Sequence, residues 1–243
     1  MSETVIMDFT HTYVADDFET ADGVWIDCTD ITGTNCYCDA EAQEKLRLRI
    51  APYSAAGIHF IDSGNYHYLS KLWAEKIAEP FSLVLFDHHP DMQAPRFEGV
   101  LSCGGWVRAL LEESRWLQRV YIIGASSALK AEAQGYEGRL HYITEEKAIS
   151  FPQLGKNFFL TAEEKIYLSI DKDVLATSEV HTNWDQGSLS LQQLTYQLQC
   201  IFRETQVIGA DVCGEDPELA DAAHKAQNRA VNRTLHHLLN TYL

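Results

Sequence analysis

Carboxylates and imidazoles gather in three short segments of the chain, and each segment follows a run of apolar or β-branched residues. The segments read D-S-G-N-Y-H at 62–67, D-H-H-P-D at 87–91 and S-I-D-K-D at 169–173. The runs before them, at 58–61, 82–86 and 165–168, are typical of buried strands. Because ligands of open α/β sheets bind beyond the carboxyl ends of the strands, we expect the three segments to meet in one cleft.

The spacing within these segments directs the side chains to a common point. In an extended segment, residues two apart point to the same side of the chain, which brings both aspartates and the second histidine of D-H-H-P-D together. The predicted metal ligands are His67, Asp87, His89, Asp91, Asp171 and Asp173. So many carboxylates in one place require cations. Mixed carboxylate and imidazole ligands suit a pair of manganese ions, with iron or zinc as alternatives.

Strand-like and helix-like segments alternate along the chain. We expect strands at 24–26, 58–61, 83–86, 120–123, 166–170 and 207–211, and helices at 68–78, 106–117 and 191–202. A last helix is expected to begin at Asp216-Pro217-Glu218 and to run to the C-terminus, since Asp is a favourable N-cap and Pro a favourable first residue. This alternation predicts a three-layer α/β fold, with a mostly parallel sheet and helices on both faces. No linker divides the chain, so residues 1–243 are expected to form one domain.

The composition argues against several classes of function. The chain has 19 Lys and Arg against 35 Asp and Glu, which disfavours nucleic acid as a partner because phosphate binding needs a basic face. No apolar run approaches the roughly 18 residues of a membrane span, and Met1 to Asp8 do not read as a signal peptide. We therefore expect a cytoplasmic protein with reduced thiols. Cys36 and Cys38 lack a second pair with the spacing of a zinc site.

The three segments, in this order, resemble the motifs of the ureohydrolase superfamily, which comprises arginases, agmatinases and formimidoylglutamases. D-H-H-P-D is similar to the family motif D-A-H-x-D, and S-I-D-K-D to S-F-D-V-D. G-N-Y-H at 64–67 is a weakened form of G-G-D-H, and D-V-C-G-E-D-P at 211–217 resembles D-I-x-E-x-N-P. The resemblance runs from about residue 58 to the end, so the segment with Cys36 and Cys38 has no counterpart among these motifs.

The resemblance implies an arginase-like fold and a hydrolase with two Mn²⁺ ions. By position, Asp87 and Asp171 would bridge the ions. The remaining ligands divide into two pairs, His67 with Asp91 and His89 with Asp173. In that family the ions activate a water that attacks the carbon of a guanidinium or related C–N group. Asp91 matches the carboxylate that passes a proton to the leaving amine, and His88 is not a ligand in this mapping.

Two departures from the family pattern concern the substrate. The guanidinium-binding Glu of the family falls on Gly214 here, and Glu215 lies one residue late, which turns its side chain to the other face unless the strand has ended. Asp185 is the other candidate acid, and the adjacent Trp184 could either stack on a planar cation or cover the core. The family's His-Gly segment is replaced by L-S-C-G-G at 101–105, with Cys103 as either a substrate contact or a small buried thiol.

We therefore predict hydrolysis of a guanidino group to urea and an amine. The substrate is either a small guanidino compound or an arginine within a peptide, because the chain lacks the loops that read a free amino acid and resembles the small peptide arginases in size. The alternatives are a formimino or amide hydrolase of the same fold and a metal-binding relative without turnover. Since ureohydrolases often form trimers or hexamers, a homo-oligomer is expected, although no segment defines an interface.

Overall fold

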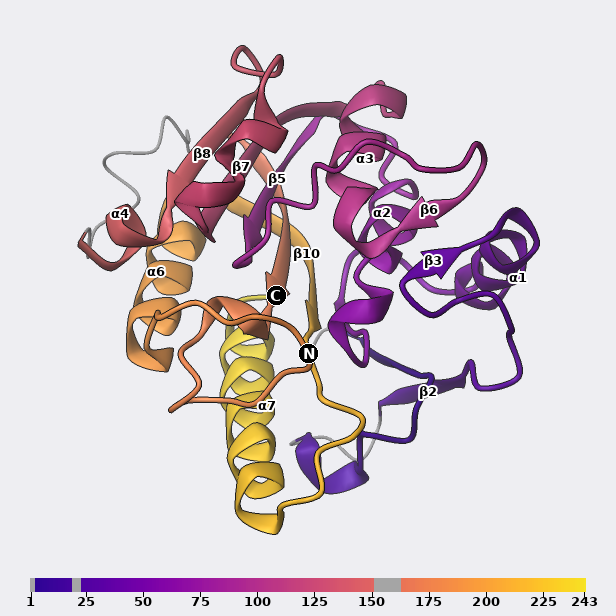
Figure 1. Ribbon diagram of the computed structural model, residues 1–243, viewed down its shortest axis with the longest axis vertical. Helices are drawn as coiled ribbons and strands as arrows, with labels where there is room; N and C mark the ends of the chain where they lie inside the picture. The colour runs from indigo at the N-terminus through magenta and orange to yellow at the C-terminus, as the bar shows by residue number, and fades with distance from the viewer. Residues whose placement is uncertain (1–2, 19–22, 151–162) are drawn as a thin grey trace.

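The computed structural model describes residues 3–18, 23–150 and 163–243, and a sheet of eight parallel strands forms its centre (Figure 1). The strands are β1 (Thr4–Asp8), β2 (Val24–Asp27), β4 (Ile58–Phe60), β5 (Phe81–Phe86), β7 (Leu117–Ala125), β8 (Leu140–Thr144), β9 (Lys165–Asp171) and β10 (Gln206–Cys213). Their order across the sheet is β2-β1-β4-β10-β9-β5-β7-β8. A separate antiparallel pair joins β3 (Tyr37–Cys38) to β6 (Leu101–Ser102).

Helices pack on both faces of the sheet. They are α1 (Ala40–Ile50), α2 (Leu69–Ala74), α3 (Trp106–Glu113), α4 (Glu145–Ser150), α6 (Leu191–Glu204) and α7 (Ala222–Tyr242). The first three contribute buried side chains to one core cluster, and α4, α6 and α7 contribute to a second cluster. The predicted three-layer α/β fold with a parallel sheet is therefore confirmed.

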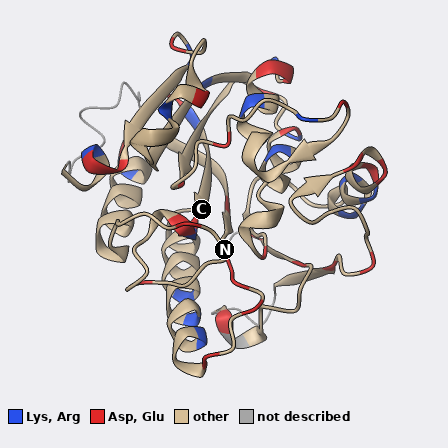
Figure 2. Cartoon of the chain, in the orientation of Figure 1, with Lys and Arg blue, Asp and Glu red and all other residues tan. Residues whose placement is uncertain are grey.

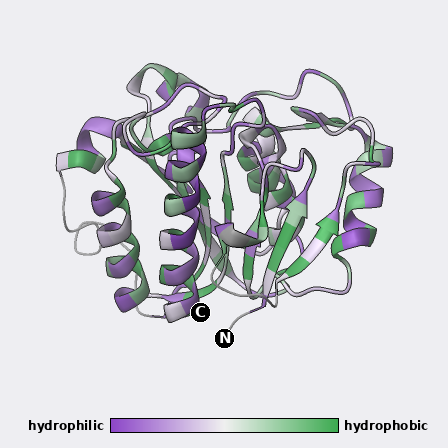
Figure 3. Ribbon diagram, turned by 90° about the horizontal axis from the view of Figure 1, so that it is seen from below, coloured by the Kyte–Doolittle hydropathy of each residue, from purple (hydrophilic) through white to green (hydrophobic). Residues whose placement is uncertain are grey.

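Strand β5 shows how the sheet separates the two clusters. All six of its residues are buried, with Leu83 and Leu85 in the first cluster and Val84 and Phe86 in the second. Successive side chains of a strand point to opposite faces, so a strand covered on both sides is apolar throughout. Figure 3 shows this as hydrophobic colour along the central strands, while the helices carry both polar and apolar residues.

The start of the C-terminal helix was predicted wrongly. Asp216 accepts a hydrogen bond from the backbone N–H of Glu218 and forms a tight turn instead of a helix N-terminus. Helix α7 begins at Ala222, because the carboxylate of Asp221 accepts hydrogen bonds from the backbone N–H groups of Ala223 and His224. An aspartate does cap this helix, but it is Asp221, five residues after Asp216.

Other elements also differ from expectation, including β8 and α4, which were not predicted, and α2, which ends at Ala74. Helix α3 ends at Glu113, and Leu117, which was assigned to that helix, opens strand β7. Strand β1 was not predicted and precedes the strand that was expected to be the first. Its apolar run is too short to be distinctive. Helix α1 was not predicted, because only Ala42, Leu46 and Ile50 among its residues are buried, and such a narrow apolar stripe gives a weak periodic signal.

Charge and hydrophobicity are distributed as in an ordinary globular protein. No helix in the described part of the chain is both long and apolar enough to cross a membrane. Figure 2 shows acidic residues on many helices and loops, so the net charge of −16 is not confined to the cleft. All six cysteines are free thiols.

Buried His59 on β4 predicts a loss of stability in acid. Its Nδ1 lies 3.2 Å from the Tyr167 hydroxyl, its Nε2 lies 3.1 Å from the Ser54 carbonyl, and its ring stacks on Trp73. Burial lowers the pKa of His59 to about 3. Between that value and the unfolded value of about 6.5, the unfolded chain binds more protons, so the free energy of unfolding falls as the pH is lowered. We expect a loss on the order of 4 kcal/mol across this interval.

Urea denaturation of the metal-free protein at several pH values measures this effect. The His59→Gln variant should show a shallower pH dependence than the wild type. The exposed His224, replaced in the same way, serves as the control and should leave the slope unchanged. Equal slopes for wild type and His59→Gln would show that His59 is not the group responsible.

Candidate metal centre

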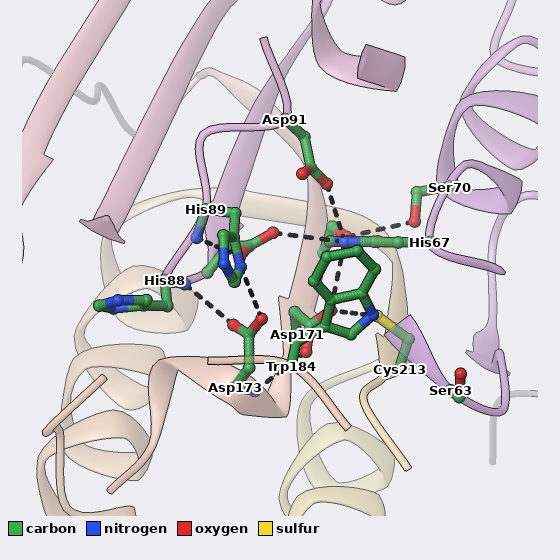
Figure 4. Close-up of polar contacts among 12 residues, drawn as sticks. Ser63, His67, Ser70, His88, His89, Asp91, Asp171, Asp173, Trp184 and Cys213 are labelled. Atoms are coloured by element: carbon green, nitrogen blue, oxygen red, sulfur yellow. Dashed lines mark hydrogen bonds and ion pairs between the residues drawn. The ribbon is translucent and has the colours of Figure 1, made fainter. Parts of the chain in front are cut away.

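Four neighbouring strands, β4, β10, β9 and β5, end at one edge of the sheet and deliver the polar side chains. The segments after β4, β5 and β9 carry the three motifs, and Figure 4 shows their side chains pointing toward one another. Strand β10 lies between β4 and β9, so the last strand of the chain ends in the middle of this edge. The three motif strands are therefore not consecutive neighbours, and the strand that separates two of them adds residues of its own to the site.

His67 is buried, and its two ring nitrogens face different partners. Nε2 lies 2.9 Å from the hydroxyl of Ser169, which donates to Oδ1 of Asp211 at 2.7 Å. When Nε2 donates to this hydroxyl, the lone pair of Nδ1 is free to bind a metal. Nδ1 faces three carboxylates, with distances to their Oδ2 atoms of 3.1 Å for Asp91, 3.3 Å for Asp87 and 3.4 Å for Asp171. A lone pair and three carboxylates that face one another require a positive charge between them.

His89 organises the other side of the cluster. Its Nδ1 lies 2.9 Å from Oδ2 of Asp173 and 3.6 Å from Oδ1 of Asp87. Oδ1 of Asp173 accepts a hydrogen bond from the backbone N–H of His88 at 3.0 Å. Oδ1 of Asp171 accepts one from the backbone N–H of Asp173 at 2.9 Å. The backbone of the two motifs thus orients the carboxylates, while the His88 side chain points away from the cluster (Figure 4).

Burial raises the pKa values of the carboxyl groups in the cluster. It raises the pKa of Asp173 to about 6, with a further contribution from the charge of Asp87. It also raises the pKa values of Asp91 and Asp171. For His89, burial lowers the pKa, but the hydrogen bonds to Asp173 and Asp87 outweigh burial and raise it to about 12. The cluster therefore holds protons tightly when no metal is bound, and a divalent cation would replace them.

The ligand atoms fit a pair of divalent cations. Three groups of described residues place their ligand atoms within 4.8 Å of one another: His67, Asp87 and Asp91; Asp87, His89 and Asp173; and His67, Asp171 and Cys213. Asp87 belongs to two groups, as a bridging carboxylate would. Its Oδ2 is buried without a hydrogen-bond partner, which is unusual for a carboxylate oxygen and is the state expected of an atom reserved for a metal. The six predicted ligands are thus brought together, with a cysteine beside them.

A cleft of about 220 Å³ opens above these ligands. Its wall includes Cys36 and Tyr37, from the segment that matched no family motif, together with Gln93 and Cys103. The pairing of β3 with β6 explains this position, because the backbone N–H of Cys103 donates to the carbonyl of Cys36 at 3.0 Å. A hydrogen bond with Cys103 lowers the pKa of Cys36 to about 7. The N-terminal segment therefore forms part of the site, and Cys103 lies at the cleft as expected.

Trp184 also lies at the cleft, held by a contact between two loops. Its Nε1 donates to Oδ1 of Asn65 at 2.9 Å, and its ring meets that of His89 edge-on with centroids 5.8 Å apart. A Cβ atom at Gly64 would lie 2.9 Å from the Trp184 ring and 3.0 Å from Oδ2 of Asp171. Glycine at this position therefore lets the indole approach the ligands closely.

Glu215 and Asp185 do not line the cleft. Glu215 is buried on the other side of the β10 terminus, where it forms an ion pair with Lys172 and accepts a hydrogen bond from Asn232 at 2.7 Å and one from Asn228 at 3.0 Å. Asp185 is exposed. The sequence pattern could not show that the Lys of S-I-D-K-D is fully buried and draws the carboxylate of Glu215 away. Neither acid is among the described residues that line the cleft.

Several residues of the site were not anticipated. Trp106 donates from Nε1 to Oδ2 of Asp91 at 2.6 Å, and Ser169 and Asp211 orient His67. Cys213 lies in register with Asp171 on the neighbouring strand. The sequence does contain a signal for Cys213. It lies two residues after Asp211 on β10, so both side chains point to the same face of the sheet.

The family comparison agrees with this geometry. A model of the Arginase family matches residues 7–239. The chain is 33% identical over 165 residues to an uncharacterized protein of Thermotoga maritima, a match that covers 68% of this chain and 60% of that protein. The chain therefore spans less than two thirds of the length of this relative.

Solved structures share the fold at lower identity. Proclavaminate amidino hydrolase from Streptomyces clavuligerus superposes with a TM-score of 0.71 at 17% identity, covering 100% of this chain and 92% of that one. Trypanosoma cruzi formiminoglutamase with Mn²⁺ superposes with a TM-score of 0.69 at 16% identity, covering 99% and 94%. At these identities the likeness concerns the fold alone.

Proposed function

The chain belongs to the arginase family, and from this we propose that it is a hydrolase that cleaves a C–N bond of a guanidino group to give urea and an amine. We propose two divalent ions as cofactors, with Mn²⁺ as the first candidate. The observation that carries the proposal is the convergence of six ligand side chains at one sheet edge. They are His67, Asp87, His89, Asp91, Asp171 and Asp173.

The residues around the proposed metal ions would have different roles in this reaction. When bound, a pair of divalent ions would lower the pKa of a water and so supply a nucleophile near neutral pH. Asp211 and Ser169 hold the ring of His67, which keeps Nδ1 directed at the cluster. Asp91 is the proton carrier: burial raises the pKa of its carboxyl group, and Trp106 fixes its Oδ2. It would take a proton released at the cluster and deliver it to the leaving amine.

The cleft favours a substrate without a carboxylate close to the guanidino group. Among the described residues, those that line the cleft include no Lys or Arg that could bind such a carboxylate. Tyr37 and Trp184 offer aromatic surfaces instead, which suit a planar cation. A guanidino amine or an arginine within a peptide fits this wall better than free arginine does.

A second candidate is hydrolysis of a formimino or related amidine C–N bond. All four acids that line the cleft, Asp87, Asp91, Asp171 and Asp173, are proposed metal ligands. With Glu215 paired to Lys172, no further described carboxylate at the cleft is available to hold a full guanidinium. A smaller, less strongly cationic amidine needs no such partner.

A substrate panel distinguishes these candidates. Protein loaded with Mn²⁺ is incubated with agmatine, arginine, an arginine-containing peptide and a formimino compound, and urea, formamide and ammonia are measured. Urea from agmatine or the peptide, with little from arginine, is the expected result. Formamide from the formimino compound alone would establish the second candidate. No product from any compound, with bound metal confirmed, would contradict the proposed hydrolase and favour a metal-binding relative without turnover.

Trp184 provides a test of how the substrate is held. We expect Trp184→Ala to raise KM about fivefold with little change in kcat, since stacking on a cation contributes on the order of 1 kcal/mol to binding. Trp25 on β2 is the matched control, being 42% exposed against 39% for Trp184 and absent from the cleft wall. A lower unfolding temperature with unchanged KM would mean that Trp184 covers the core rather than the substrate.

A further inference from the structure

The thiol of Cys213 lies among the metal ligands. Cys213 is the last residue of β10, fully buried, and its register partner on β9 is Asp171. Because residues in register on parallel strands point to the same face, both side chains enter the cluster together. Sγ lies 3.1 Å from Oδ2 of Asp171 and belongs to the ligand group of His67 and Asp171 (Figure 4).

The surroundings of this thiol are unlike those of an ordinary buried cysteine. A buried cysteine usually packs as a small hydrophobic side chain, whereas this one faces His67 and a carboxylate. Oδ2 of Asp87 faces the same Nδ1 of His67 at 3.3 Å, is buried and has no hydrogen-bond partner. The Cys213 thiol, His67 and Asp171 thus place their ligand atoms within 4.8 Å of one another. A cation between them would bind all three.

We propose that Cys213 is a metal ligand and that it makes the two halves of the centre chemically different. The proposal rests on the binuclear centre proposed above. On the His67 side the ligands would include a thiolate, whereas on the His89 side they are imidazole and carboxylate only. On binding, the thiol proton leaves to solvent and the sulfur lone pair forms the bond to the metal.

A thiolate changes which metals the centre prefers. Thiolates select zinc and iron over manganese, whereas carboxylate and imidazole accept manganese readily. We therefore expect the His67 side to favour Zn²⁺ or Fe²⁺ and the His89 side to accept Mn²⁺. When both kinds of ion are available, this single side chain would therefore favour a mixed pair, while Mn²⁺ alone could still occupy both sides.

Cobalt titration of the metal-free protein tests the proposal without measuring activity. Co²⁺ bound to thiolate gives a charge-transfer band in the near ultraviolet. We expect the band in the wild type and its loss in Cys213→Ser, with Co²⁺ still bound as measured by elemental analysis. Cys103→Ser, whose thiol lines the same cleft, and Cys200→Ser on α6 should both retain the band.

Metal competition gives a second readout. Replacing Cys213 should reduce the preference for Zn²⁺ over Mn²⁺ by at least about tenfold. Cys213→Ala replaces the serine variant if the latter does not fold, as judged by circular dichroism. Bound Co²⁺ without a band in the wild type would overturn the proposal and leave Cys213 as a hydrogen-bond donor to Asp171, with the proposed hydrolase unaffected. A band that survives in Cys213→Ser but disappears in Cys103→Ser would overturn it in favour of Cys103. Failure to bind Co²⁺, Mn²⁺ or Zn²⁺ at all would overturn this proposal and the proposed function together.

Discussion

Asp171→Asn should lower kcat/KM by at least about a thousandfold and reduce the bound metal, since a carboxylate that binds the metal directly contributes several kcal/mol to transition-state stabilisation. The amide oxygen of Asn carries no charge and cannot join two cations as a carboxylate does. Oδ1 of Asp171 would still have its backbone partner, the N–H of Asp173, so the local backbone should be kept. The measurement pairs steady-state kinetics with elemental analysis of the purified variant.

In the metal-free protein, Asp171→Asn should not lower stability, in contrast to its effect on activity. Burial and the charge of Asp173 both disfavour an ionised Asp171, so its neutral replacement should leave the unfolding temperature unchanged or higher. The rise in unfolding temperature that Mn²⁺ produces in the wild type should be largely absent. Asp185→Asn, an exposed position outside the cleft wall, is the control for the loss of one charge. Full metal content and turnover in Asp171→Asn would show that the ligand assignment is wrong.

The second large effect concerns the buried ion pair between Lys172 and Glu215. Lys172 is fully buried, and its Nζ contacts Glu215 and, at 2.8 Å, Oδ1 of Asn232. Removing one partner leaves the other charge buried and unpaired, so Lys172→Met should cost about 3–5 kcal/mol in the free energy of unfolding. Urea denaturation of the metal-free protein measures it.

Glu215→Gln tests the same pair and its functional interpretation together. The amide would keep a hydrogen bond to Asn232 but leave Lys172 without a counter-charge, so a loss of stability of similar size is expected. The double variant with Lys172→Met should be more stable than the sum of the two losses predicts. If Glu215 bound the guanidinium, Glu215→Gln would instead raise KM and leave the stability nearly unchanged.

The sequence predicts the sheet and the ligands because both depend on local patterns. Strands such as β5 are continuous apolar runs, and the three motifs follow such runs directly, so His67 and Asp173 can be located from their own segments of the sequence. Parallel strands then bring their carboxyl ends to one edge by geometry alone. The acidic motifs therefore identify both the strand ends and the side chains that meet beyond them.

Features that depend on strand order or on distant partners are harder to predict from the sequence. That β10 lies between β4 and β9 is a property of the whole sheet, and only this order places Cys213 among the ligands. Glu215 is directed away from the cleft by Lys172, which is 43 residues earlier in the chain. Helix α1 has too few buried residues for its period to be evident. In each case the deciding interaction joins segments that are far apart in sequence.

Gly214 limits how this site could be altered. Its φ is +97°, and a Cβ atom there would lie 2.5 Å from Oδ1 of Asp171 and 2.9 Å from the backbone nitrogen of Lys172. Any side chain at 214 would therefore displace Asp171, a proposed metal ligand, in addition to the strain that such a φ imposes. The family pattern calls for a glutamate at this position. Gly214→Glu alone would therefore not create that arrangement in this backbone. The backbone after β10 would have to follow a different path, and Lys172 would have to lose Glu215 as its partner. The proposed substrate preference would therefore resist a change at position 214 alone.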